Sequence, residues 1–341
     1  MTPFAQEHRP EGPRRLAVVG TMVWDTIHDP TGHRAPLQEW GGIGYALGAL
    51  AAALPEDWEV VPIIKVGRDL AEDAYRFLRE IPRVRPEDAL VVVPEPNNRV
   101  ELHYTTGSRR SERLSGGVPP WIWPELASRV RGCDAVYVNF ISGYEMDLDA
   151  ARALRAGYQG PTYADLHSLF LGIGQEGLRV PRPLPEWEDW LGCFDVVQMN
   201  EDEFDLLGRV QGDPWALAAG VVGTQLKLIC ITLAGRGAAY VAGSAFDSDP
   251  STWWETRHRV GSSGPFRSGR VPLDGLPAEG DPTGCGDVWG ATFFARLLAG
   301  DLLEEAMARA NRSAARNVTH RGARGLHLHL AGRLAPGRDQ R

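Results

Sequence analysis

The chain has 341 residues, of which 43% are hydrophobic and 23% charged, a composition typical of a globular protein rather than a disordered one. Its formal net charge of −8 excludes a general binder of nucleic acid or of anionic membranes, because such binders need a basic surface. Segment 1–14 has no apolar run of the signal-peptide kind, and no stretch of about 18 apolar residues is available to span a membrane. We therefore expect a soluble, cytoplasmic protein with no membrane partner.

Short apolar runs alternate with longer amphipathic segments along most of the chain. The pattern predicts helices over 44–54 and 70–81, and strands over 16–20, 60–66, 135–141, 162–164, 195–199 and 226–233. Such alternation is typical of a doubly wound, mostly parallel α/β sheet flanked by helices, with ligands bound at the carboxyl ends of the strands.

One such sheet can absorb the whole length, so a single domain over 15–330 is predicted, with flexible ends at 1–14 and 333–341. The four cysteines are scattered without metal or redox spacing, and we expect reduced thiols at Cys133, Cys193, Cys230 and Cys285.

A segment near 88–115 interrupts this rhythm. Two β segments, 89–93 and 99–105, follow one another across a Pro/Asn-rich turn with no helix between them. The pattern is compatible with an antiparallel hairpin at the edge of the main sheet, or with a small β lid that stands outside it.

The strongest local signal is the glycine-rich run Gly280-Asp-Pro-Thr-Gly-Cys-Gly-Asp287, which is followed by an apolar helix over 288–298. The first turn of a helix exposes unpaired N–H groups and the positive end of its dipole. Because Gly284 and Gly286 flank Cys285, a phosphate can approach those N–H groups closely.

Asp287 has two interpretations at this position. A carboxylate near the start of a helix is commonly a capping residue. Beside an anion-binding loop, it can instead act as the base that removes the proton from an attacking hydroxyl group. The local sequence alone favours the capping interpretation, because Asp is so frequent near the N-terminus of a helix.

The run 281–287 resembles the C-terminal signature of the PfkB/ribokinase family of carbohydrate kinases, usually Asp-Thr-x-Gly-Ala-Gly-Asp. Pro282 stands in place of the usual Thr, and Cys285 in place of the usual Ala. The resemblance implies a ribokinase-like fold and ATP-dependent transfer of a phosphoryl group to a hydroxyl group. It also implies that Gly284, Cys285 and Gly286 form the anion hole and that Asp287 is the general base. The β segments then become the substrate lid.

Two N-terminal motifs resemble the substrate side of the same family. Gly20-Thr-Met-Val-Trp-Asp25 is similar to a first-strand motif whose Asp binds substrate hydroxyls, although a solvated turn aspartate is the simpler interpretation. Trp40-Gly-Gly-Ile-Gly44 resembles the family's Gly-Gly signature, in which Gly41 and Gly42 would let the substrate approach the backbone. The family usually has Asn shortly afterwards, where this chain has Ala46.

Two further motifs resemble the donor side. Asn200-Glu-Asp-Glu203 is similar to the Asn-x-x-Glu motif, which implies Mg²⁺ near Glu203 and nucleotide contacts at Asn200, although both residues also suit a helix cap. Thr232 to Gly237 loosely matches the nucleotide region, with Thr232, Gly235 and Gly237 as candidate contacts. The implied cofactors are ATP and Mg²⁺, with a monovalent cation such as K⁺ as a further expectation.

Other enzyme classes lack their motifs in this chain. There is no GxxxxGK[ST] loop, no GxGxxG after the first strand and no GxSxG elbow. His327 and His329 lie close together in a strand-like tail without a third metal ligand. The remaining alternatives are a nucleoside kinase of the same family, or a catalytically weak regulator that binds a sugar or a nucleotide.

The acceptor of the phosphoryl group stays open between sugars and nucleosides. An unusual polar pair near the predicted site, Asp165 and His167, follows a strand and has no assigned role. A homodimer formed through the lids is also expected, because a small β lid leaves unpaired edges that a second copy can cover.

Overall fold

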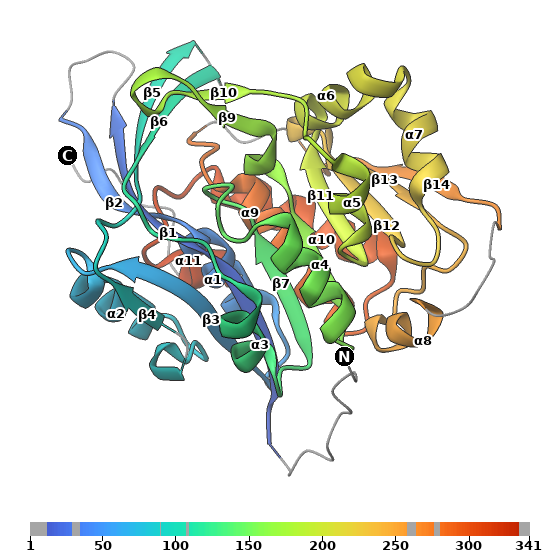
Figure 1. The fold of residues 1–341 in the computed structure, drawn as a ribbon, viewed down its shortest axis with the longest axis horizontal. Coiled ribbons are helices and arrows are strands. Elements are labelled where there is room, and N and C mark those ends of the chain that lie inside the picture. Colours follow the sequence, from blue (N-terminus) through green and yellow to red (C-terminus); the bar gives the residue numbers. More distant parts are fainter. Residues whose placement is uncertain are drawn as a thin grey trace.

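The computed structural model describes residues 12–28, 35–88, 90–106, 109–257, 264–275 and 280–333. Most of the two predicted flexible ends lies outside these residues. A large sheet with helices on both faces forms the body of the molecule (Figure 1). Its main path runs in the spatial order β14 (Arg267–Val271), β13 (Ala238–Ala242), β12 (Leu228–Thr232), β11 (Val196–Asn200), β8 (Thr162–Asp165), β7 (Ala135–Asn139), β1 (Arg14–His28), β3 (Trp58–Gly67) and β4 (Leu90–Val93).

The strands from β12 to β4 along this path are all parallel, so their carboxyl ends meet at one edge of the sheet. The predicted doubly wound α/β fold is therefore confirmed. On this path only β13 runs in the opposite direction, so its pairings with β12 and with β14 are antiparallel. The sequence analysis predicted neither β13 nor β14, because both are short and no helix separates them.

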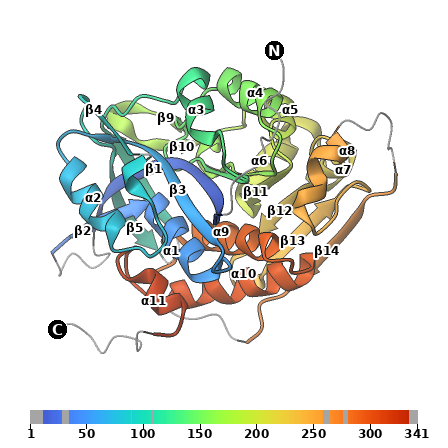
Figure 2. The ribbon, with the colours of Figure 1, turned by 90° about the horizontal axis from the view of Figure 1, so that it is seen from below.

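Alternation of side chains along the strands builds two hydrophobic cores, one on each face of the sheet. In β1, Leu16 and Val18 point into one core, and Ala17 and Val19 point into the other. Figure 2 shows the two helical layers with the sheet between them. The first core is covered by α1 (Ile43–Ala53), α2 (Ala71–Arg79), α9 (Cys285–Leu298), α10 (Leu303–Asn317) and α11 (Leu326–Leu330). The second is covered by α3 (Trp123–Val130), α4 (Leu148–Gly157), α5 (Trp187–Gly192), α6 (Glu201–Gln211) and α7 (Pro214–Val221).

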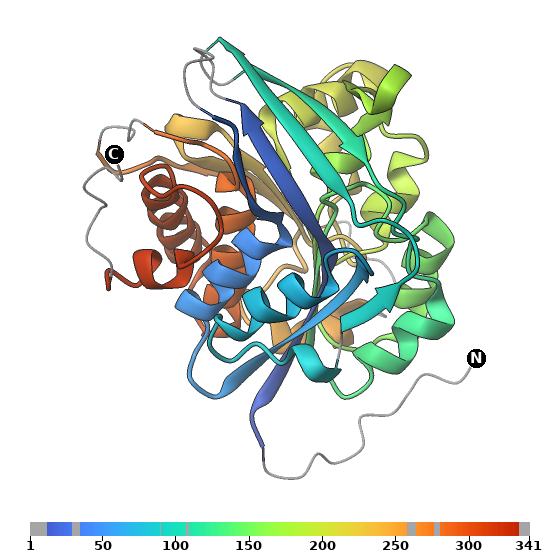
Figure 3. The same cartoon turned by 90° about the vertical axis from the view of Figure 1, so that its left-hand side faces the viewer.

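The lid is a small branch of the sheet, built on the far half of β1. That half pairs antiparallel with β2 (Leu37–Gly42) and parallel with β5 (Arg99–Thr106), and β5 forms a hairpin with β6 (Arg109–Ser115). Figure 3 shows these long strands rising beyond the main sheet. A β lid is therefore present, and a short hairpin of β9 (Leu171–Ile173) and β10 (Arg179–Pro181) lies next to it, joined by a bridge between Arg113 and Leu178.

The predicted pairing inside the lid is wrong in one respect. Segments 89–93 and 99–105 do not pair with each other, because β4 extends the main sheet in parallel with β3, where Leu90 and Val93 are buried. The turn between β4 and β5 is held by Asn97, whose side chain accepts from the Gly67 N–H at 3.0 Å and donates to the Met22 carbonyl at 3.1 Å. The hairpin that the sequence suggested is thus formed one strand later, by β5 and β6.

The strand predicted around His327 and His329 is also wrong, because both residues lie in the short helix α11. His329 and Leu330 are buried, and the segment packs against α1 and α10 rather than joining a sheet. Among the described residues, no helix combines the length and the apolar character that crossing a membrane requires.

Candidate active site

Polar side chains end four neighbouring strands at the edge of the sheet where the carboxyl ends meet. Asn139 ends β7 and pairs in register with Asp165, which ends β8. Asn200 ends β11 and is in register with Thr232 at the end of β12. The preceding residues of these strands are almost all apolar and buried, and they serve the packing of the core. The polar residues at the strand ends therefore mark the candidate site for ligand binding and catalysis.

The loop that precedes α9 closes over this edge of the sheet. Gly284 is the N-cap of α9 and has a left-handed backbone with φ 75°. A β-carbon there would overlap the ring of Tyr45, which is buried in α1, so glycine is required for the close approach of α1 to the loop. The predicted glycine-rich helix start is therefore where the sequence analysis expected it.

Cys285 shows how the chain accommodates its departure from the usual Ala. Its side chain turns toward α10, where Sγ lies 3.4 Å from the Ala314 carbonyl and 3.3 Å from Asn317 Nδ2. Its N–H donates to the Pro282 carbonyl at 3.1 Å. Of the three predicted anion-hole residues, Cys285 thus already uses its N–H within the loop.

Asp287 lies in the first turn of α9 and is connected to the centre of the sheet. Its Oδ1 accepts a hydrogen bond of 2.8 Å from Asn139 Nδ2. One ligand atom from each of Asp165, His167 and Asp287 lies within 4.8 Å of the others. Because Gly284 is the helix cap and Asp287 bonds to β7, the simple capping interpretation does not account for this carboxylate.

A buried hydrogen-bond network holds Asp165 and the loop in place. Gln198 Nε2 donates to Asp165 Oδ2 at 3.0 Å and to the Gly286 carbonyl at 3.1 Å, while its Oε1 accepts from the Tyr163 hydroxyl. Such a network gives a unique geometry, because every member would be costly to leave unpaired in a buried place.

His167 brings positive charge to this acidic cluster. Burial alone would lower its pKa, but the hydrogen bond and charge of Asp165, together with the charges of Asp287 and Glu203, raise the pKa to about 10. The imidazole is therefore protonated at neutral pH and offsets part of the negative charge around Asp287.

Asp25 approaches the same region from the lid strand β1. It is 5% exposed, and a β-carbon added at Gly41 would overlap its carboxylate, so Gly41 on β2 is required for the side chain to lie where it does. Gly42 has φ 58° and caps α1. The solvated turn interpretation of Asp25 is wrong, because the strand continues through this residue and buries it.

Tyr45 lies between the lid side and the α9 side of the site. Burial raises its pKa well above the usual range, and the charges of Asp25, Glu39, Asp281 and Asp287 act in the same direction. The charges of residues from both the N-terminal and the C-terminal predicted motifs therefore act on one buried ring, and the ring itself packs against Gly284.

Asn200 and Glu203 form a reciprocal capping box at the start of α6. Glu203 Oε2 accepts from the Asn200 N–H, and Oε1 accepts from Asn200 Nδ2, both at 2.7 Å. Burial raises the pKa of Glu203 to about 7, with the charge of His167 opposing this shift. The capping interpretation is thus correct for both residues, and it leaves the second lone pair of each carboxylate oxygen available.

The region from Thr232 to Gly237 is only partly explained by nucleotide approach. Gly237 has φ 91°, and its close neighbours are the backbone atoms of Val271 and Leu273, so its glycine serves the packing of β13 against the segment after β14. Thr232 and Gly235 lie at the end of β12 and in the short turn that follows it.

Sequence reasoning missed Asn139 and Gln198, gave no role to Asp165 and His167, and weighed Tyr45 between stacking on a substrate ring and core packing. A signal was present for two of them, because Asn139 and Gln198 are polar residues within otherwise apolar strands. Tyr45 lies in an Ala/Leu-rich helix, where an aromatic residue is indistinguishable from core packing.

Comparison with known proteins supports the same fold. No curated protein matches the chain. Solved structures similar to it include a nucleoside kinase of Burkholderia thailandensis in complex with inosine, which is 15% identical with a TM-score of 0.66 and coverage of 94% of this chain and 96% of that one. Ribokinase of Thermotoga maritima is 17% identical, with a TM-score of 0.66 and coverage of 94% and 98%. Ribokinase of Cryptococcus neoformans in complex with ADP is 17% identical, with a TM-score of 0.64 and coverage of 95% and 100%.

The family comparison concerns the C-terminal part of the chain. Residues 176–328 match the model of the pfkB family carbohydrate kinase, and this segment contains the capping box of α6 and the glycine-rich loop of α9. The C-terminal part of the chain is thus similar to the pfkB family of carbohydrate kinases, and nearly the whole chain shares its fold with the solved ribokinases.

Proposed function

We propose that this protein is an ATP-dependent kinase that phosphorylates a hydroxyl group, preferably a hydroxymethyl group, of a small sugar or sugar-like molecule. The observation that carries the proposal is the position of Asp287. Its carboxylate lies in the first turn of α9, is hydrogen-bonded by Asn139 from β7, and shares the surroundings of Tyr45 with Asp25 from the lid strand.

In this proposal, Asp287 accepts the proton of the acceptor hydroxyl group while the hydroxyl oxygen attacks the γ-phosphorus of ATP. The bond between that phosphorus and the β,γ-bridging oxygen breaks, and ADP leaves with the electron pair. The N–H groups of Gly284 and Gly286, at the positive end of α9, stabilise the charge on the transferring group. We assign Cys285 a smaller share, because its N–H already donates to Pro282.

The residues present fit a Mg²⁺ ion on the donor side. Asp165 and Asp287 offer carboxylate oxygens, the ligands that Mg²⁺ prefers, and Glu203 keeps lone pairs beyond its capping bonds with which it can hold a metal-bound water. When bound, the ion neutralises charge on the phosphate groups. Asn200, Thr232 and Gly235 remain candidates for the nucleotide side, and a requirement for K⁺ remains a prediction of the family resemblance.

A nucleoside acceptor is the second candidate, favoured by the structural similarity to the nucleoside kinase that was solved with inosine. A regulator that only binds its ligand is disfavoured by the Asn139–Asp287 hydrogen bond, because a binding site has no need for an oriented base. Self-association through the lids likewise remains a prediction from the sequence.

The proposal is tested by ADP release with a panel of sugars and nucleosides, in the presence of Mg²⁺ and K⁺, with pyrophosphate as an alternative donor. We expect at least one acceptor to raise ADP release above the acceptor-free rate and to gain one phosphate group by mass. ADP release that no acceptor stimulates, or phosphorylation that only pyrophosphate supports, would count against ATP-dependent transfer.

Replacing Asp25 by Asn should raise the KM for the acceptor and leave kcat nearly unchanged, because this carboxylate is proposed to bind hydroxyl groups and not to move a proton. Hydrogen bonds to a charged group contribute about 1.5–3 kcal/mol, so an increase of roughly 10- to 100-fold is expected. Thr26→Val is the matched control, since Thr26 is the next residue of β1 and points to the opposite face. Equal losses of kcat and of kcat/KM in Asp25→Asn would contradict the binding role.

Replacing Glu203 by Gln should raise the Mg²⁺ concentration that gives half of the maximal rate by about 10- to 100-fold. This is the range found when an outer partner of a metal site is lost. Gln also suits the third position of a capping box, so helix α6 should persist. Glu201→Gln serves as the control, because Glu201 lies in the same helical turn as Glu203 and its carboxylate pairs with Arg236 at the surface. An unchanged Mg²⁺ titration in Glu203→Gln would remove Glu203 from the metal site.

A further inference from the structure

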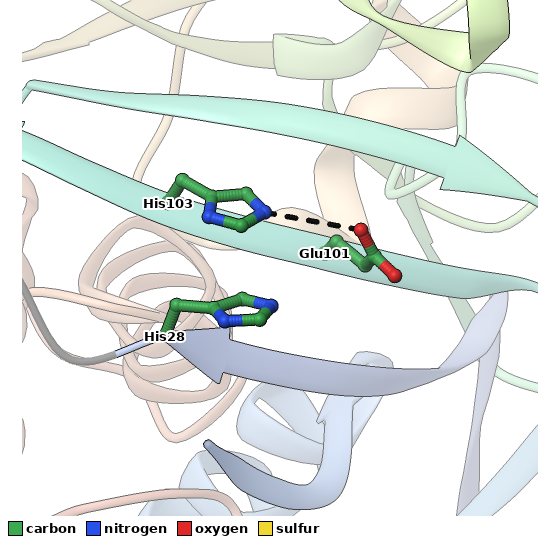
Figure 4. Close-up of side chains that lie close together, drawn as sticks. All are labelled: His28, Glu101 and His103. Atoms are coloured by element: carbon green, nitrogen blue, oxygen red, sulfur yellow. Dashed lines mark ion pairs between the residues drawn. The ribbon is translucent and has the colours of Figure 1, made fainter. Parts of the chain in front are cut away.

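A cluster of two histidines and one glutamate lies on the lid, where β1 and β5 run side by side (Figure 4). The parallel register places His28 opposite His103 and Thr26 opposite Glu101. Since side chains alternate along a strand, these residues share the face of the lid that is opposite to the face carrying Asp25. The cluster is therefore separate from the candidate active site.

The geometry of the three side chains suits a small cation. The rings of His28 and His103 are stacked, with centroids 4.0 Å apart and planes inclined by 13°. His103 Nε2 lies 3.8 Å from Glu101 Oε2, and one ligand atom from each residue lies within 4.8 Å of the others. A tetrahedral zinc ion with bonds of about 2.1 Å holds its ligand atoms about 3.4 Å apart, so binding would require the three groups to close and the two stacked rings to tilt until their nitrogen lone pairs converge.

The buried ring nitrogen of His28 is the observation that points to a ligand. Within the described part of the chain, His28 Nε2 is buried and has no hydrogen-bond partner. A buried polar atom without a partner is costly, and an imidazole nitrogen in that condition can be satisfied by a metal ion.

A second pair of stacked histidines, His320 and His329, provides a contrast within the same chain. There, His320 Nε2 faces the Arg324 carbonyl at 3.0 Å, and His329 Nε2 faces the Arg316 carbonyl at 3.0 Å. Stacking of imidazoles alone therefore does not leave a ring nitrogen unsatisfied.

We propose that His28, Glu101 and His103 form a binding site for a divalent transition-metal ion such as Zn²⁺, with a fourth position open to water. Two imidazoles and one carboxylate are a donor set that favours Zn²⁺ over Mg²⁺, which prefers oxygen ligands. Glu101 supplies the negative charge, because the neighbouring Arg113 on β6 is paired with Glu176 at 3.0 Å. The ion would link β1 to β5 through its ligands and so stabilise the lid that carries Asp25.

The test is a calorimetric titration of the full-length, chelator-treated protein with Zn²⁺ alone. We expect His28→Ala and His103→Ala to lose one binding event, and Glu101→Gln to weaken it by more than the about 10- to 100-fold that an outer partner contributes. His320→Ala is the matched control and should bind as the unmodified protein does. Because Asp165, His167 and Asp287 are a second potential site, the lid event must also survive in His167→Ala.

A second measurement keeps the inference independent of the titration. Zn²⁺ bound to the folded state should raise the melting temperature, and the increase should disappear in His103→Ala, whose side chain is 44% exposed and whose loss the fold should tolerate. Unchanged Zn²⁺ affinity in both histidine variants, or the same thermal shift in them as in His320→Ala, would overturn the lid site without affecting the proposed kinase reaction.

Discussion

Replacing Asp287 by Asn should lower kcat by about 10²–10⁴-fold and leave ATP binding nearly intact, because general-base catalysis contributes that much to proton transfer. A sugar hydroxyl is a very poor acid, so its oxygen needs a carboxylate within hydrogen-bond reach while the proton leaves. Asn keeps the size of the side chain, and Asn139 can still present its amide to the retained oxygen. The measurement is kcat with an identified acceptor, together with the ATP dissociation constant from calorimetry.

Two controls separate the base from other roles of this residue. Asp202→Asn removes an exposed carboxylate near the start of α6 and should leave kcat unchanged. Asn139→Ala keeps the base but removes the side chain that orients it, so an intermediate loss of kcat is expected. If Asp287 served only the helix terminus, Asn would replace it well, and a near-normal kcat would refute the assignment.

Replacing Asp195 by Asn should destabilise the fold by about 3–5 kcal/mol, the cost of removing one partner from a buried ion pair. Asp195 precedes β11 at the end remote from Asn200 and is completely buried. Its Oδ1 accepts from Arg155 and from Arg257, both at 2.9 Å, and Arg257 also reaches Oδ2. The amide would leave the buried guanidinium group of Arg257 and the partly buried one of Arg155 without a balancing charge.

The measurement is the free energy of unfolding from urea denaturation, with Asp189→Asn as the control. Asp189 pairs with Arg152 on the surface, so its loss should cost less than about 1 kcal/mol. A similar cost for the two variants would contradict the prediction. The activity per folded molecule should persist in Asp195→Asn, because the change lies at the opposite end of the sheet from Asp287.

Acid should act on the same ion pair. Burial alone would raise the pKa of Asp195, but the hydrogen bond and charge of Arg257, and the charge of Arg155, lower it to about 2. A carboxyl group whose pKa is lowered in the folded state stabilises the fold at a pH above its pKa in the unfolded chain, which is near 3.8. That contribution is lost as the pH falls through the folded-state pKa of about 2. The unmodified protein and Asp195→Asn should therefore differ less in their free energy of unfolding as the pH falls from 3.8 to about 2.

The sequence by itself determined the elements whose signals are local. Apolar runs of strand length and helices with amphipathic spacing predicted the parallel sheet, because burial on both faces selects those patterns. The glycine-rich start of α9 could also be predicted from the sequence. The structure explains the glycine, since Gly284 adopts φ 75° and leaves room for Tyr45. Asp287 was identified as a candidate base from the same short run.

Only the tertiary structure decided which partners these elements find. Asn139 and Asp287 are 148 residues apart in the chain, and their hydrogen bond exists because β7 ends where α9 begins. β4 joined the main sheet rather than the next lid strand, since the edge of β3 offered both hydrogen bonds and a core for Leu90 and Val93. His28 and His103 likewise meet only through the register of β1 and β5. Pairing between distant strands depends on the topology of the whole sheet, whereas periodicity reports only on the surroundings of each segment.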